Sequence, residues 1–194
     1  MPLRRVSTEP TATLRERDDT ALVAGLARGE VRALDELISR YADRLCSFLE
    51  RIVRDGGWAD DLVQEAFVRV YDGAHSYDPA WPVRVWIFRI ARNLAVDLMR
   101  REGSMRNHLQ QIVPREDAPS TVATVEHREF QAQLENAIRT LPEGFRSVFL
   151  LRENENLSYE EIGEILNISV KTVSSRLHRS RLQLKEQLKR YLDS

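Results

Sequence analysis

Apolar residues recur at steps of three and four along most of this chain, and that spacing is typical of amphipathic helices. The pattern predicts helices over residues 20–27, 31–54, 58–74, 83–101, 125–140 and 142–153, and then two more between residues 157 and 185. No segment alternates as a half-buried strand would, and the sequence shows no internal repeat. The sequence therefore predicts an all-α fold.

Two stretches interrupt the helical pattern. Residues 1–18 are polar, of mixed charge and contain two prolines, so we expect a disordered tail there. Residues 102–124 lose the periodicity and contain Pro114 and Pro119, which is typical of a linker. We therefore expect two small helical domains, residues 19–101 and 125–194, joined by a flexible linker.

The last two predicted helices carry signals for a tight helical pair. Ser158 and Glu161 have the spacing of a capping box, so the first helix begins there. Asn167 tolerates the left-handed backbone of a short turn, and Ser169 is placed to cap the second helix. The buried stripe of that second helix is predicted to contain Val170, Val173, Leu177 and Leu184. This arrangement predicts a helix-turn-helix.

Charge is segregated between these two helices. Residues 170–190 contain seven Lys or Arg against one acid, whereas the first helix carries Glu160, Glu161 and Glu164. An ordinary helical hairpin with a solvated basic face is the alternative. Charge placement favours DNA binding, because no carboxylate opposes a phosphate at the start of the second helix. The candidate DNA-binding residues are Lys171, Thr172, Ser174, Ser175, Arg176, His178, Arg179 and Arg181.

The helix predicted at residues 58–74 has a largely acidic outward face, made of Asp60, Asp61, Gln64 and Glu65. Taken alone, a solvated helix face is the better interpretation. Paired carboxylates also suggest acid–base catalysis, but the neighbouring sequence offers no nucleophile, metal-ligand cluster or phosphate loop. We therefore expect no catalytic site, metal or cofactor.

The fourth predicted helix carries a row of side chains suited to unpaired bases. Rings stack on bases, guanidinium groups hold phosphates and an amide can read a base edge. The alternative is that Trp86 is simply a core residue and that the arginines are solvated. The row and the loop before the helix contain Tyr77, Trp81, Trp86, Arg89, Asn93, Asp97 and Arg100.

Composition narrows the class of protein. A content of 42% hydrophobic and 30% charged residues is typical of a soluble globular protein. The net charge of −1 does not by itself indicate nucleic-acid binding, so contacts with DNA would depend on a local basic patch. The single cysteine, Cys46, permits no internal disulfide and is expected in the core. The first residues do not form a signal peptide, and no stretch approaches the length of a membrane span, so we expect a cytoplasmic protein.

These segments, in this order, resemble a bacterial RNA polymerase sigma factor of the extracytoplasmic-function (ECF) group, in the sigma-70 family. The motifs are DDLVQEAFVRVY (60–71), SYDP (76–79), WIFRIARNLAVDLMRR (86–101), LPEGFRSVFLLRENENLSYEEIGEIL (141–166) and SVKTVSSRLHRSR (169–181). The resemblance covers about residues 20–190 and implies the minimal type, with the family's second and fourth regions only. Ser174 departs from the Lys or Arg of many relatives, and the loop at residues 79–82 is unusually rich in proline.

The resemblance implies partners and roles. The acidic face of Asp60, Asp61, Gln64 and Glu65 would bind core RNA polymerase. Tyr77, its loop and Asn93 would capture bases of the melted −10 promoter element, together with the rest of the row. The basic helix would read the −35 element. Because base contacts in a helix-turn-helix come chiefly from the early part of the recognition helix, we expect Arg176 to contact bases and Lys185 to anchor the backbone. The resemblance also implies an anti-sigma factor as a further partner.

Two other functions compete with this interpretation. A response regulator also ends in a helix-turn-helix, but it requires an N-terminal receiver with alternating strands, and residues 20–101 are predicted to be helical. A sigma-like adaptor that only sequesters an anti-sigma factor has no need of the basic helix. The sequence therefore favours a promoter-specificity subunit and not an enzyme.

Overall fold

The computed structural model describes residues 14–53, 56–106 and 125–192. Its α-helices are α1 (Asp19–Ala27), α2 (Arg32–Ile52), α3 (Ala59–Gly73), α4 (Val83–Arg106), α5 (Val125–Thr140), α6 (Glu143–Glu153), α7 (Tyr159–Leu166) and α8 (Val170–Leu192). Short 3-10 helices cover Leu14–Glu16, Gly56–Trp58 and Ala74–Ser76. The described residues contain no strand, which confirms the all-α prediction.

Two boundaries differ from the prediction. Part of the predicted tail is ordered, because the Arg40 guanidinium donates to the carbonyls of Leu14 and Arg15 at 3.3 and 3.1 Å. Asp18 then caps α1 by accepting from the Ala21 amide at 2.7 Å. At the other end, α4 continues to Arg106, into the predicted linker. Residues 1–13 of the tail and residues 107–124 of the linker lie outside the described residues.

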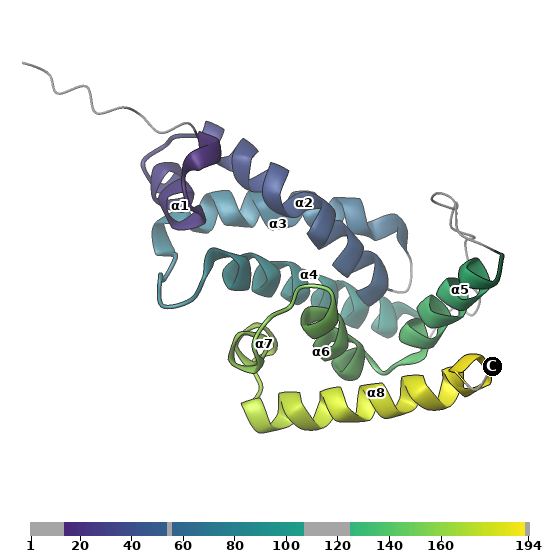
Figure 1. Cartoon of the computed structure of the whole chain (residues 1–194). Helices are drawn as coiled ribbons and strands as arrows, with labels where there is room; N and C mark the ends of the chain where they lie inside the picture. Colours follow the sequence, from purple (N-terminus) through teal and green to yellow (C-terminus); the bar gives the residue numbers. More distant parts are fainter. Residues whose placement is uncertain (1–13, 54–55, 107–124, 193–194) are drawn as a thin grey trace, which may run out of the picture.

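Helices α1 to α4 form the first domain. In Figure 1, α2 and α3 run across the domain and α4 lies below α3. The apolar stripes predicted from the spacing face one another, and Leu37, Leu45, Ile87 and Phe88 are completely buried. The rings of Phe48 and Phe88 meet edge to face at 5.5 Å, which joins α2 to α4.

Helices α5 to α8 form the second domain. Figure 1 shows α8 as a long helix at the edge of the molecule, with α6 and α7 lying between α8 and α4. Leu150 and Leu151 of α6 and Ile162 and Ile165 of α7 are buried with Val173 of α8. The two domains contact each other: α4 packs against α7, and α2 packs against α5 and α6.

Cys46 lies on α2, facing α3, and is half-buried, not fully enclosed in the core as the sequence predicted. Burial raises the pKa of its thiol to about 11, and the neighbouring carboxylates of Glu50 and Asp60 add to the shift. The reactive form of cysteine is the thiolate, so this residue is held in its unreactive form at neutral pH.

Candidate nucleic-acid interface

The helical pair α7–α8 has the geometry that the sequence predicts. The Ser158 hydroxyl accepts from the Glu161 amide at 3.1 Å, and the Glu161 carboxylate accepts from the Ser158 amide at 2.8 Å. Asn167 adopts the left-handed conformation with φ 51° and ψ 52°. The Ser169 hydroxyl then accepts from the Thr172 amide at 3.2 Å. Local hydrogen bonds therefore determine where both helices begin, as in a helix-turn-helix.

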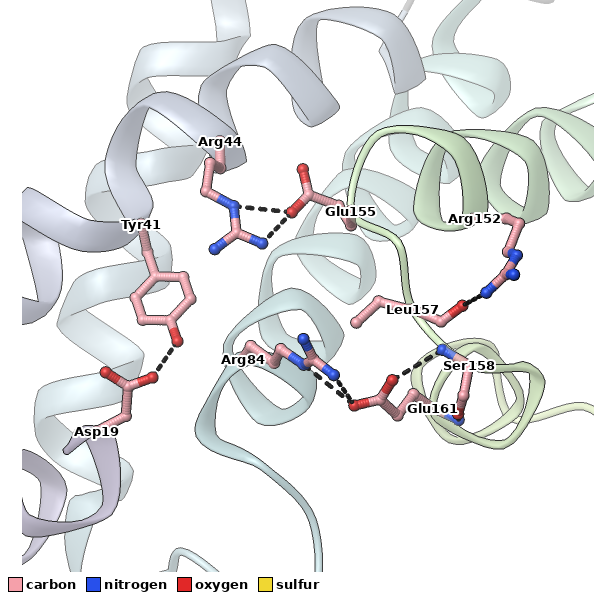
Figure 2. Close-up of polar contacts among 9 residues, drawn as sticks. All are labelled: Asp19, Tyr41, Arg44, Arg84, Arg152, Glu155, Leu157, Ser158 and Glu161. Carbon is pink, nitrogen blue, oxygen red and sulfur yellow. Dashed lines mark hydrogen bonds and ion pairs between the residues drawn. The ribbon is translucent and has the colours of Figure 1, made fainter.

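Two features of this motif have no clear signal in the sequence. Arg152 of α6 donates to the Leu157 carbonyl at 2.7 Å (Figure 2). Its guanidinium also lies 5.6 Å from the centre of the Tyr159 ring. These contacts tie the end of α6 to the start of α7. On α8, Ser180 is completely buried, and its hydroxyl lies within hydrogen-bonding distance of the Phe145 carbonyl of α6 at 3.0 Å and of the Arg176 carbonyl of its own helix at 2.7 Å. Ser180 thus links α8 to α6.

Gly163 allows the turn to pack closely against α7. A Cβ at this position would lie 2.8 Å from the Ile168 carbonyl oxygen, which belongs to the backbone of the turn. We expect Gly163→Ala to lower the free energy of unfolding by about 1–3 kcal/mol, because the backbone must shift to relieve the overlap.

Chemical denaturation of the full chain measures this effect, and Gly144→Ala is the matched control. At Gly144 the added Cβ would meet only the end of the flexible Arg176 side chain, at 2.9 Å. Equal stability of the two variants would contradict the proposed role of Gly163.

The faces of α8 differ from the predicted pattern at two positions. Val173, Leu177 and Leu184 are buried as predicted, but Val170, the first residue of α8, is 42% exposed. Arg176 is half-buried, with its guanidinium against Gly144 of α6. The remaining predicted contacts are exposed or half-buried along the outer side: Lys171, Thr172, Ser174, Ser175, His178, Arg179 and Arg181. Of these, Arg181 pairs with Glu153 at 2.6 Å.

The row predicted on α4 is divided between the core and the surface. Trp86 is only 9% exposed, which matches the alternative interpretation that it is a core residue. The Tyr77 ring packs against Trp86, with centroids 5.1 Å apart, and its hydroxyl donates to the Trp81 carbonyl at 2.7 Å. Burial also raises the pKa of Tyr77. The loop at residues 77–82 is therefore held in a defined shape by an aromatic pair.

The rest of the row lies nearer the solvent. Asn93 is exposed, and the Arg100 side chain is 77% exposed beside Asp97, at 3.6 Å. Arg89 is half-buried and pairs with Glu164 of α7. Asn93 and Arg100 are thus open to a ligand in this arrangement, whereas Arg89 already has an anionic partner.

The acidic face of α3 is exposed at all four predicted positions. Glu65 also pairs with Arg69 one turn later at 3.0 Å. The structure adds two apolar side chains that the charge pattern did not indicate, since Val68 is 53% exposed and Tyr71 is 42% exposed. A charged face with exposed apolar side chains at one end is typical of a protein–protein interface.

Comparisons with known proteins identify both halves of the chain. Residues 37–105 match the Sigma-70 region 2 family, and residues 131–184 match the Sigma-70, region 4 family. The ECF RNA polymerase sigma-E factor of Haemophilus influenzae is 32% identical over 88% of this chain and 95% of its own length. The chain belongs to the ECF sigma factors.

Two further similar proteins support the assignment of this sigma factor to the family. The ECF sigma factor SigE of Mycolicibacterium smegmatis is 37% identical over 81% of this chain and 62% of its own length. The structure of CnrH in complex with the cytosolic domain of CnrY superposes with a TM-score of 0.67 over 88% of this chain and 97% of CnrH, at 27% identity. Regions 2 and 4 of this sigma factor correspond to helices α2–α4 and α5–α8. In the part of the chain that the structure describes, no helix is long and apolar enough to cross a membrane.

Proposed function

We propose that this sigma factor binds core RNA polymerase and directs it to specific promoters, with α8 reading the −35 element and α4 with its preceding loop holding the melted −10 element. RNA synthesis belongs to the polymerase, and we assign no catalytic step to this chain. The observation that carries the proposal is α8: one face is buried in region 4, and the other presents cations and hydroxyl groups after a correctly capped turn.

The outer face of α8 suits a major groove. A recognition helix contacts bases mainly with its first turns, and cations farther along hold the phosphate backbone. Ser175, His178 and Arg179 lie in those first turns and are exposed. Because Arg176 turns toward α6, we propose that it holds α8 in position. We assign the base contacts to Arg179 and its exposed neighbours. Lys185 keeps its assignment as a backbone anchor.

The −10 assignment rests on the Tyr77 loop. Its aromatic pair and the exposed amide of Asn93 offer a stacking surface and a group that can read a base edge. Trp86 would serve by supporting Tyr77 from within the core. The polymerase partner is assigned to the acidic face of α3, and an anti-sigma factor is a further expected partner. We place this activity in the cytoplasm.

Tyr77→Ala should weaken binding of the holoenzyme to a single-stranded −10 oligonucleotide by about 1–3 kcal/mol if a base stacks on this ring. Tyr77→Phe is the matched control, because it keeps the ring and removes only the hydroxyl that donates to Trp81. Fluorescence anisotropy measures the affinity of both variants for the oligonucleotide. If Tyr77→Ala binds as tightly as the wild type, the ring only supports the loop.

The whole proposal is tested by reconstituting the holoenzyme and sequencing the DNA that it binds and the transcripts that it starts. A promoter-specificity subunit yields a shared −35 and −10 pattern upstream of new transcripts. A response regulator would bind DNA without the polymerase, and an adaptor would bind an anti-sigma factor but select no DNA. Holoenzyme that starts no transcript at defined sites would refute the proposal.

A further inference from the structure

The last turn of α6 makes side-chain contacts with both parts of the helix-turn-helix. Arg152 donates to the Leu157 carbonyl just before α7 (Figure 2). The next residue, Glu153, contacts α8 instead, where one of its oxygens, Oε1, accepts from Nη2 and Nε of Arg181 at 2.6 and 3.2 Å. Two adjacent residues at the end of α6 therefore connect it to two different helices.

A carboxylate at position 153 is disfavoured by the helix that carries it. Glu153 is the last residue of α6, where carbonyl groups without helical partners give the helix end a partial negative charge. DNA bound to the outer face of α8 would bring more negative charge near this acid. The pair with Arg181 is exposed, with 40% of the Glu153 side chain open to solvent, and exposed pairs contribute little to stability. Stability alone therefore does not account for an acid here.

Arg181 belongs to an exposed stripe along α8. Steps of three and four residues place it in line with Lys171, Ser174, His178 and Lys185. The early members of this stripe lie in the turns that a recognition helix inserts into the groove, and cations farther along contact the phosphate backbone. Arg181 lies between His178 and Lys185 and is therefore suited to a phosphate at the edge of the groove.

Arg181 is also the cation of α8 that is held in one orientation. Among the α8 side chains that the structure describes, no other arginine or lysine makes an ion pair. Glu153 occupies the edge of the guanidinium formed by Nε and Nη2, which leaves the N–H groups of Nη1 for a second acceptor. A long side chain that is already ordered loses less entropy when it binds an anion.

The carboxylate has two opposing effects on DNA binding. Its charge repels phosphate and offsets part of the Arg181 charge, but solvent and salt screen this effect at an exposed site. The ordering of the arginine side chain is not screened. We propose that Glu153 is a positioning residue for promoter binding, which holds the Arg181 guanidinium in the orientation that binds a backbone phosphate beside the −35 element. This inference rests on the proposed function of α8.

The sign of the effect of Glu153→Gln tests the proposal. The reconstituted holoenzyme is titrated with a duplex carrying the −35 pattern recovered by sequencing and with a random duplex of the same length. We expect Glu153→Gln to weaken binding to both duplexes about two- to fivefold, although it removes a negative charge, because Arg181 must then be ordered on binding. Glu153→Ala, which removes the acceptor altogether, should weaken binding at least as much.

The matched control is Glu160→Gln, which removes the same charge from an exposed acid of α7 that has no ion pair in the described part of the chain. It should bind both duplexes as tightly as the wild type or more tightly. Circular dichroism should show equal helical content in all variants. If Glu153→Gln binds as tightly as this control, the carboxylate is only a solvated acid and the proposal is wrong.

A second substitution shows whether Glu153 acts through Arg181. Arg181→Ala should weaken both duplexes alike and lower the salt slope by about one unit, as expected for the loss of one phosphate contact. In that background Glu153→Gln should no longer weaken binding. An equal loss from Glu153→Gln with and without Arg181 would show that the acid acts by another route, and would overturn the proposal.

Exchanging the two charges separates positioning from simple bracing. Glu153→Arg combined with Arg181→Glu restores an ion pair between α6 and α8 but places the acid on the face proposed for DNA. We expect this double variant to keep its helical content and to bind both duplexes at least tenfold more weakly than the wild type. Recovery of wild-type affinity would show that the pair only braces the two helices, and would refute the assignment.

Failure of the proposed function gives a different result. If α8 does not read promoters, the wild-type holoenzyme yields no shared −35 pattern, and neither Arg181→Ala nor Glu153→Gln changes its affinity for any duplex. If the pattern is present and Arg181→Ala weakens binding while both substitutions of Glu153 leave it unchanged, the proposed function stands and the positioning role alone is wrong.

Discussion

Reversing Asp61 and Glu65 to lysine together will abolish co-purification of this sigma factor with core RNA polymerase. Both side chains are exposed on α3, so the double change moves the charge of one helix face by four units without disturbing the core. Like charges brought together at an interface cost several kcal/mol. Val68 and Tyr71, exposed on the same helix, would supply the apolar anchors of that interface. We expect affinity to fall by roughly a hundredfold or more, which is about 3 kcal/mol.

The measurement is co-purification of tagged sigma factor with core enzyme, followed by titration. Asp43→Lys is a suitable control, since this acid is exposed on α2 and lies outside the α3 face. Circular dichroism should show unchanged helical content for all variants. Normal holoenzyme formation by the double variant would remove the acidic face of α3 from the mechanism.

Arg179→Ala will cost about 1–3 kcal/mol on a −35 duplex and will relax selectivity within that element. Arg179 is exposed on the outer side of α8, within the turns that a recognition helix inserts most deeply. Lys185→Ala, farther along, should weaken all duplexes alike and lower the salt slope by about one unit. Arg176→Ala should also weaken specific and random duplex equally, because the guanidinium packs against Gly144 and acts through the position of α8.

Competition binding with specific and random duplexes at several salt concentrations separates these outcomes. The reconstituted holoenzyme is the protein to use for these measurements. Selectivity lost with Arg176→Ala and kept with Arg179→Ala would reverse the two assignments and return base reading to Arg176.

The sequence was most informative where structure depends on near neighbours. The capping box of Ser158 and Glu161, the left-handed turn at Asn167 and the apolar stripe of α8 all arise from residues within a few positions of each other. Hydrogen bonds and helical periodicity act at that range, so composition and spacing suffice to predict them. The acidic face of α3 followed from the same periodicity, since an apolar stripe on one side determines which side is exposed.

Other features depended on which helices meet. Trp86 lies in the row suited to bases, yet it is buried, because Gly73 of α3 leaves room for its ring and Tyr77 covers it. The side chain of Arg176 could point to solvent, but the glycine at position 144 opens a place for it on α6. Periodicity reports the face on which a residue lies. It does not report the shape of the surface opposite.

By itself, therefore, the sequence determined the all-α class, the positions of the helices, the helix-turn-helix and the segregation of charge between α7 and α8. Only the tertiary structure decided that the two regions close on each other, with five arginines of region 2 facing five glutamates of region 4 across separations of 51 to 111 residues. The physical reason is range. A helix forms from contacts within one or two turns, whereas an ion pair between distant helices depends on the placement of whole elements, which no local pattern records.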